Sequence, residues 1–215
     1  MALMNNAGLD RMTDLKARDT YHHGDLRRAL LDAAEDELSE KGPEGFTLRG
    51  CAKRAGVSHA APAHHFGDIT GLLSALAGEG YQRFHAAIEA RMDASPDQTP
   101  QARMVAAGLG YVAFARANPA LFGLMFSSRK PDYDDPALEN AASAAFDQLV
   151  DSVAAFHGDD PLSSRKGRQQ VAAIWSVVHG LSDLLLSQRL KLLTQQGDGD
   201  IEQDLTGILR ALINP

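Results

Sequence analysis

Apolar residues recur at three- and four-residue steps along most of this chain, which is the spacing of one face of an α-helix. The first such segment starts at Gly24. It ends at Lys41–Pro43, where a glycine and a proline follow a basic last turn. Thr47 is a candidate N-cap for a second helix, and Ser58 for a short third helix that runs to about His65. Three helices are therefore predicted between residues 24 and 66.

The rest of the chain shows the same spacing in longer segments. A long helix is predicted from about Asp68 to Met92, and the polar, proline-containing segment Asp93–Pro100 is predicted to end the small N-terminal unit. No window shows the alternation typical of a β-strand, so the sequence predicts an all-α fold. Residues 1–22 lack helical spacing and are predicted to be a flexible leader. The further predicted helices cover 101–117, 137–156, 165–192 and 201–212, with a shorter one after Pro119.

Charge argues against nucleic-acid binding over the whole chain, but its distribution changes that conclusion. Lys and Arg number 21 against 28 Asp and Glu, giving a net charge of -7, whereas DNA-binding domains usually run basic. Residues 45–67, however, hold no acidic residue and include Arg49, Lys53, Arg54 and three histidines. Phosphate contact depends on the local field, which salt limits to about 8–10 Å. The segment can thus present a basic face to DNA, although a solvated helix face without a partner explains the same charges.

Two short helices joined by a tight turn at Gly56 fit the helix-turn-helix motif, in which the second helix enters the major groove. A plain helical hairpin would show the same periodicity. The segments DLRRALLDAAEDELSEKG, FTLRGCAKRAGVSHAAPAHHF and LLSALAGEGY resemble the DNA-binding domain of the TetR/AcrR family of transcriptional regulators. The segments YVAFARANPALFGLMF and WSVVHGL resemble that family's WHG-type C-terminal domain, with Trp175, His179 and Gly180 as the name-giving residues.

The resemblance implies an all-helical homodimer with three functional parts. These are a helix-turn-helix DNA-binding domain over 23–67, a connecting helix over 68–92, and a ligand-binding and dimerisation domain over 93–215. His59 and Ala60 occupy the positions where the family's recognition helix meets base edges. The local charge and the resemblance together give these candidate DNA-binding residues: Thr47, Arg49, Lys53, Ser58, His59, Ala60, His64 and His65.

Three positions depart from the family pattern. Ala63 stands where tyrosine is usual, His64 where arginine is common, and Ile69 where a lysine often opens the next helix. Each replacement removes a phosphate partner, so we expect DNA binding that is weaker and less salt-sensitive than in typical relatives. The departures also support an alternative function, that of a helical ligand- or partner-binding protein with a degenerate DNA-binding head.

The C-terminal part carries candidates for a ligand pocket and a dimer interface. Tyr111 and His179 add polar tips to apolar helical faces, as an apolar pocket requires, although core packing explains most of the neighbouring aromatic residues. The pocket candidates are Tyr111, Phe114, Phe122, Met125, Trp175 and His179. The last two predicted helices have apolar seams that suit packing within one chain or, as the resemblance implies, an isologous dimer. The interface candidates are Val171, Ile174, Val178, Leu181, Leu185, Leu205, Ile208 and Leu212.

These features predict a ligand-responsive repressor that binds a palindromic DNA operator as a homodimer and is released by a small, largely apolar effector. Nucleophile-elbow, phosphate-loop, dinucleotide-binding and HExxH motifs are missing from the sequence, so it predicts no enzyme and no cofactor. The three histidines of residues 45–67 lack the spacing of a metal site, and none is predicted.

The lone cysteine, Cys51, cannot form an internal disulfide and is predicted to be a small residue of the buried core. The sequence has neither an apolar run of membrane-spanning length nor a signal-peptide pattern. We therefore expect a cytoplasmic protein without a membrane partner.

Overall fold

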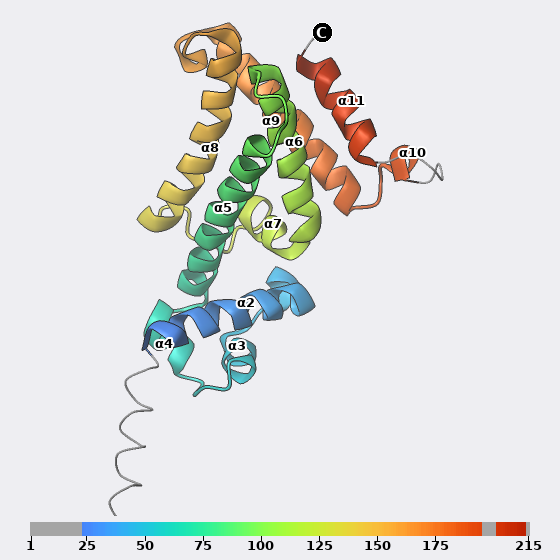
Figure 1. Ribbon diagram of the computed structural model, residues 1–215. Coiled ribbons are helices and arrows are strands. Elements are labelled where there is room, and N and C mark those ends of the chain that lie inside the picture. Colours follow the sequence, from blue (N-terminus) through green and yellow to red (C-terminus); the bar gives the residue numbers. More distant parts are fainter. Residues whose placement is uncertain (1–22, 195–200, 214–215) are drawn as a thin grey trace, which may run out of the picture. The chain divides into compact units, whose positions relative to one another are not determined.

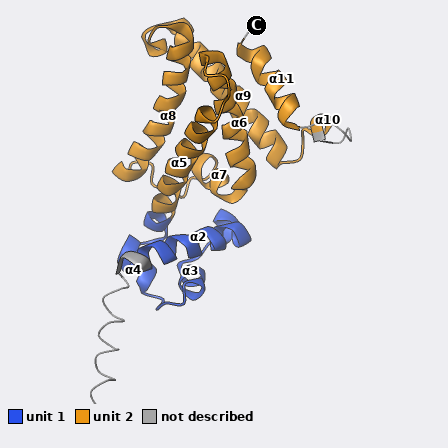
Figure 2. Ribbon diagram, in the orientation of Figure 1, with its two compact units in different colours: residues 1–72 blue, residues 73–215 orange. Residues whose placement is uncertain are grey.

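A computed structural model describes residues 23–194 and 201–213 of the chain. The predicted leader (1–22) and the predicted loop at 197–200 lie outside the described residues. The chain divides into two compact units, one extending to Leu72 and the other covering 73–215 (Figure 2).

Unit 1 is built from three helices and the start of a fourth. These are α2 (His23–Gly45), α3 (Leu48–Arg54), α4 (Ala61–Phe66) and the first turn of α5 (Ile69–Asp93) (Figure 1). The side chain of Cys51 on α3 is fully buried, and its thiol donates a hydrogen bond to the Leu30 carbonyl of α2 at 3.3 Å. The predicted core role of this cysteine is therefore confirmed.

The helix ends in unit 1 follow from individual residues. In α2 the backbone leaves helical geometry at Gly42, which has a φ of +68° and is followed by Pro43, where the sequence predicts the helix to stop. The predicted N-cap of α3 is confirmed, because the Thr47 hydroxyl accepts a hydrogen bond from the Gly50 N–H at 3.0 Å.

The predicted cap of α4 is wrong. The helix begins at Ala61, and its N-cap is Ala60 rather than Ser58. The reason lies in Pro62, which has no N–H to donate and whose ring fits only the first turn of a helix. A cap at Ser58 would place this proline beyond that turn, whereas a start at Ala61 places it within the first two positions.

Unit 2 contains the remaining helices, and every described element of both units is helical, so the all-α prediction is confirmed. Its elements after α5 are α6 (Pro100–Ala117), α7 (Pro119–Phe126), α8 (Pro136–His157), the 3-10 turn η1 (Pro161–Ser163), α9 (Arg165–Leu186), α10 (Lys191–Thr194) and α11 (Ile201–Ile213). The helix predicted over 165–192 ends early, because Gln188 adopts a left-handed backbone with φ +55°. None of the described helices combines the length and the apolar character needed to cross a membrane.

Helix α6 is central to unit 2, since it packs against α7, α8, α9 and α11. It also approaches α5 closely at Gly110, where an added Cβ would lie 3.1 Å from the Ile88 Cα. The absence of a side chain at this position lets the two backbones come together.

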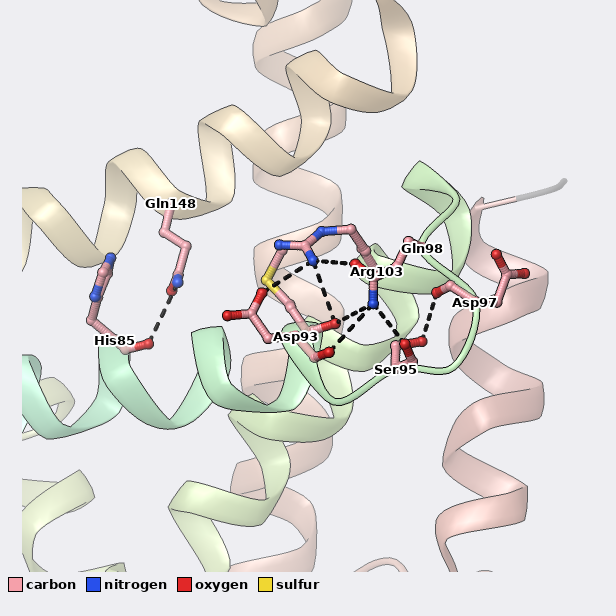
Figure 3. A network of polar contacts seen from close by, with 8 residues as sticks. His85, Asp93, Ser95, Asp97, Gln98, Arg103 and Gln148 are labelled. Carbon is pink, nitrogen blue, oxygen red and sulfur yellow. Dashed lines mark hydrogen bonds and ion pairs between the residues drawn. The ribbon is translucent and has the colours of Figure 1, made fainter.

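The segment predicted as a linker, Asp93–Pro100, is an ordered connection between α5 and α6 within unit 2 (Figure 3). Arg103 donates to the Gln98 side-chain oxygen at 2.6 Å and to the Asp93 carboxylate at 3.2 Å. The Gln98 amide in turn donates to the Ser95 carbonyl at 2.6 Å. The division between the compact units falls in α5 instead, while the functional limits of the domains stay predictions.

Candidate DNA-binding surface and ligand cavity

Helices α3 and α4 are joined by the tight turn that a helix-turn-helix requires. Gly56 has a φ of +68°, a conformation that side-chain-bearing residues rarely adopt. The turn is closed by a hydrogen bond from the Val57 N–H to the Ala52 carbonyl at 3.1 Å. Two short helices in contact across such a turn have the form of a DNA-reading unit.

The candidate DNA-binding residues lie almost entirely at the surface of unit 1. Only His65 is half-buried, and the exposed members are Thr47, Arg49, Lys53, Ser58, His59, Ala60 and His64. They come from α3, from the turn and from α4, so the structure leaves this acid-free segment open to a partner. Two of the three departures, Ala63 and His64, are exposed as well, whereas Ile69 is half-buried.

One cation of the segment has a structural role. Arg54 is hydrogen-bonded to Glu37 at 2.6 Å and also to Glu40. The Glu37 side chain is buried, and these two partners raise the pKa of Arg54 further above its usual value. Hydrogen bonds from Lys41 and Arg54 lower the pKa of Glu40 to about 2. The cations left for a phosphate are therefore Arg49 and Lys53, which are exposed and have no ion pair in the described part of the chain.

Unit 2 encloses a cavity of about 630 Å³, which is the usual size of a small-molecule site. Helices α5, α6, α7, α8, α9 and α11 all contribute to its wall. The wall is mainly aliphatic and aromatic; the aromatic lining residues are Tyr81, Phe84, Tyr111, Phe126, Tyr133, Phe146 and Trp175. Phe146 and Trp175 are also exposed, and their ring centroids lie 6.0 Å apart, so the cavity reaches solvent beside this pair.

The predicted pocket residues gather at this cavity in two layers. Tyr111, Met125 and Trp175 line it. Phe114, Phe122 and His179 lie behind them: Phe114 packs with Phe84, and the Phe122 ring stacks on His179 with centroids 5.5 Å apart.

A hydrogen bond links the two layers. The Tyr111 hydroxyl and His179 Nδ1 lie 2.8 Å apart, so His179 fixes the orientation of a lining residue. Burial raises the pKa of the Tyr111 hydroxyl, which keeps it neutral.

Sequence reasoning missed the contribution of α5 and α8 to the cavity. Gln148 and Phe146 of α8, Tyr81 of α5 and Tyr133 of the α7–α8 loop line the wall without belonging to any motif. Small residues are frequent in the middle of α8, from Ala141 to Ala145, and this is a weak signal that part of the helix borders a space.

The predicted dimer seam is largely internal to the chain. The structure buries four of its side chains against neighbouring helices of the same chain: Val171, Val178, Leu181 and Leu205. Ile174, Val178 and Leu212 line the cavity, and Leu185 and Ile208 are half-buried. The apolar pattern allowed packing within one chain or between two copies of it. At these positions the side chains pack within the chain.

The outward faces of α9 and α11 carry different residues. On α9 they include Ala173, the half-buried Gly180 and the exposed Leu184, beside Ser176 and Asp183; on α11 they include Gly207 and Ala211, beside Gln203 and Arg210. An added Cβ at Gly180 or Gly207 would meet nothing within 4 Å. Both helices thus have small residues among those they present to the outside of unit 2.

Comparisons with known proteins agree with a DNA-binding surface in unit 1 and a separate C-terminal domain in unit 2. Residues 30–76 match the family model "Bacterial regulatory proteins, tetR family", and residues 104–206 match "Tetracyclin repressor-like, C-terminal domain". The HTH-type transcriptional regulator BetI of Klebsiella pneumoniae (strain 342) is 36% identical over 80 residues, which are 37% of this chain and 41% of BetI. The chain thus spans less than half the length of this curated relative.

Solved structures share the whole fold. A protein of unknown function from Rhodococcus sp. RHA1 is 30% identical, with a TM-score of 0.75 over 90% of this chain and 96% of that one. AibR, solved in complex with isovaleryl coenzyme A and operator DNA, is 16% identical, with a TM-score of 0.62 over 88% of this chain and 99% of AibR. The N-terminal model spans α3 and α4 with their helix-turn-helix geometry, and the C-terminal model spans most of the helices around the cavity, so this chain belongs to the TetR family of DNA-binding transcriptional regulators.

Proposed function

We propose that this protein is a ligand-responsive repressor that binds a palindromic operator as a homodimer and leaves it when a small molecule fills the cavity of unit 2. The observation that carries the proposal is the presence, in one chain, of an exposed acid-free helix-turn-helix and a separate apolar cavity of about 630 Å³. The helix-turn-helix alone would fit a DNA-binding protein without a ligand, and the cavity alone would fit a ligand-binding protein without DNA. Both together fit a protein in which a ligand at one site controls binding at the other.

DNA recognition is assigned to α4 and to the turn before it. His59, Ala60 and His64 are exposed there and would reach base edges, while Arg49 and Lys53 on α3 would contact phosphates. The two cations are one helical turn apart and lie on the same side of α3. They would fix the register of the head, and the α4 residues would supply the specificity.

Dimerisation is assigned to the outward faces of α9 and α11. Ala173 and Gly180 of α9, with Gly207 of α11, would let the helices of two copies approach closely, and Leu184 would supply apolar contact at the rim. A twofold dimer places two heads on one duplex, and this requires an operator with two related half-sites.

The effector acts through the cavity in this proposal. Tyr81, Phe84 and Ile88 of the cavity wall belong to α5, and the same continuous helix begins at Ile69 in unit 1. A ligand that shifts α5 therefore acts on the helix that directly follows α4 in the chain. To release the operator, the effector must bind the state that does not bind DNA more tightly than the DNA-binding state, by a few kcal/mol. AibR, which shares the fold, was solved with both a ligand and operator DNA.

The proposal is tested by fluorescence anisotropy with a labelled duplex from the region upstream of the protein's own coding sequence and a scrambled duplex of equal length. We expect a preference for the upstream duplex, and we expect His59→Ala to weaken it about tenfold or more, since a good base contact is worth ~1–3 kcal/mol. Sedimentation of the His59→Ala variant should show an intact dimer.

His157→Ala is the matched control, because His157 is an exposed histidine on α8 in unit 2. This variant should bind the upstream duplex as the parent does. If the parent shows no preference for the upstream duplex at any salt concentration, the DNA-binding assignment is wrong and the protein is a ligand- or partner-binding relative with a degenerate head.

A further inference from the structure

One polar atom in the cavity wall lacks a hydrogen-bond partner. Gln148 on α8 lines the cavity, and its amide nitrogen donates to the His85 carbonyl of α5 at 3.4 Å (Figure 3). Its amide oxygen, Oε1, is buried and has no hydrogen-bond partner among the described residues. Exchanging the two amide atoms would turn the oxygen toward another carbonyl oxygen, so the contact with His85 fixes Oε1 as the free atom.

Three other hydroxyls of the wall donate to backbone carbonyls of the protein. The hydroxyls of Tyr81 and Tyr133 both donate to the Met125 carbonyl, at 2.9 and 2.7 Å. The Ser152 hydroxyl donates to the Gln148 backbone carbonyl at 2.8 Å. These hydroxyls have no proton left for a ligand and can only accept hydrogen bonds from one.

The Tyr111 hydroxyl is also hydrogen-bonded within the protein. The Tyr111 hydroxyl lies 2.8 Å from His179 Nδ1, and Nε2 of the same ring lies 3.7 Å from the Asp183 carboxylate. When Nε2 carries the ring proton, Nδ1 accepts from the Tyr111 hydroxyl, which then has only lone pairs to offer a ligand. The hydroxyls of Ser128 and Ser143 can turn either way and do not discriminate.

The charged residues of the cavity wall also disfavour a negatively charged ligand. Among the described residues that line the cavity none is lysine, arginine or histidine, and the only carboxylate is that of Asp147, which is exposed. A carboxylate or phosphate ligand would lose its hydration here without gaining a cation, and the donors it could meet are neutral ones. The aromatic wall accepts an apolar body and tolerates a positive charge on it.

From this pattern we propose that the cavity selects an apolar molecule that carries an N–H or O–H donor and no negative charge, and that this donor binds Gln148 Oε1. Neutral amides, alcohols and protonated amines have this chemistry, whereas carboxylates and esters do not. The inference deepens the proposed function, because it takes this cavity as the effector site.

The test is isothermal titration calorimetry of the full chain with matched sets that share one apolar body. Each set contains a primary amide, the corresponding methyl ester, the corresponding carboxylate and the corresponding primary amine, on naphthalene, phenylbutyl and decyl bodies. In at least one set we expect the amide to bind about tenfold more tightly than the ester, as one added hydrogen bond to a buried acceptor would give, and more tightly than the acid. Equal binding within every set, a preference for the carboxylate, or no binding in any set would overturn the proposal.

Two variants assign the preference to Gln148. Gln148→Leu should remove the advantage of the amide over the ester and keep the binding of the ester. Gln82→Leu, the same change at an exposed position of α5 outside the cavity wall, should leave the advantage intact. Gln148→Glu keeps the shape of the side chain and should favour the protonated amine over the amide. An amide preference that survives both changes at Gln148 would contradict the assignment.

These titrations use no DNA, so they separate the inference from the proposed function. If the amide is selected through Gln148 but does not weaken operator binding, the effector role fails and the ligand assignment stands. If the operator is bound and released by a carboxylate instead, the proposed function stands and this inference fails.

Discussion

Replacing Lys53 by alanine tests whether α3 contacts the DNA backbone. Lys53 is exposed and has no ion pair in the described part of the chain, so its charge is available to a phosphate. Each lost phosphate contact reduces the slope of log K against log salt by ~0.9, and a homodimer loses two contacts, giving a change of ~1.8. Extrapolated from 1 M to 0.15 M salt, this slope change corresponds to a loss of roughly 30-fold in affinity.

The neighbouring residue supplies the control. Arg54→Gln removes the same formal charge one position along, but Arg54 is held by Glu37 and Glu40. We expect this variant to lower the melting temperature of the protein while the salt slope of operator binding, measured where the variant is folded, stays unchanged. The assay is fluorescence anisotropy over 0.1–0.5 M salt, roughly the range in which counterion release dominates. An unchanged slope for Lys53→Ala, or an equal loss of slope for Arg54→Gln, would refute the reasoning.

Three further predictions follow from particular residues. In Gly167→Ala the new Cβ would lie 2.2 Å from the Pro161 carbonyl oxygen, a backbone atom, so the free energy of unfolding in urea should fall by about 1–3 kcal/mol; an unchanged midpoint would contradict that packing. Burial and the nearby Glu37 raise the pKa of the Cys51 thiol from 9.0 to about 11 in the folded state, so its contribution to stability is complete below pH 9 and is lost as the pH rises to 11. Thermal melts across that range should show the loss in the parent and not in Cys51→Ala. Ala63→Tyr restores the usual family residue at an exposed position and should raise operator affinity in the anisotropy assay, whereas an unchanged affinity would show that Ala63 does not face DNA.

The sequence predicted the helices well, because caps and breakers act locally. Thr47 caps α3 as expected, and Gly42 with Pro43 interrupts α2 where the pattern ends. The errors arose where two local signals competed. Ser58 is a good N-cap by residue type, but Pro62 determines where α4 can start.

The candidate site was predicted less completely, because a cavity depends on how helices are spaced. Tyr111 and His179 stood out from the sequence as polar tips on apolar helical faces, while Gln148 became relevant only when its side chain was seen to border the space. The apolar seam of α9 illustrates the same limit. Helical periodicity identifies Val171 and Val178 as inward-facing, but it does not say whether the neighbouring helix belongs to the same chain or to a second copy.

The most direct test of the account is hydroxyl-radical footprinting of the full-length protein on the DNA upstream of its own coding region. A dimer that reads DNA through two copies of α4 predicts two protected patches of related sequence, one helical turn or a small multiple of about 10 base pairs apart. Alanine at His59 should remove both patches together. A single protected patch without a symmetric partner, or uniform protection that ignores sequence, would contradict the account.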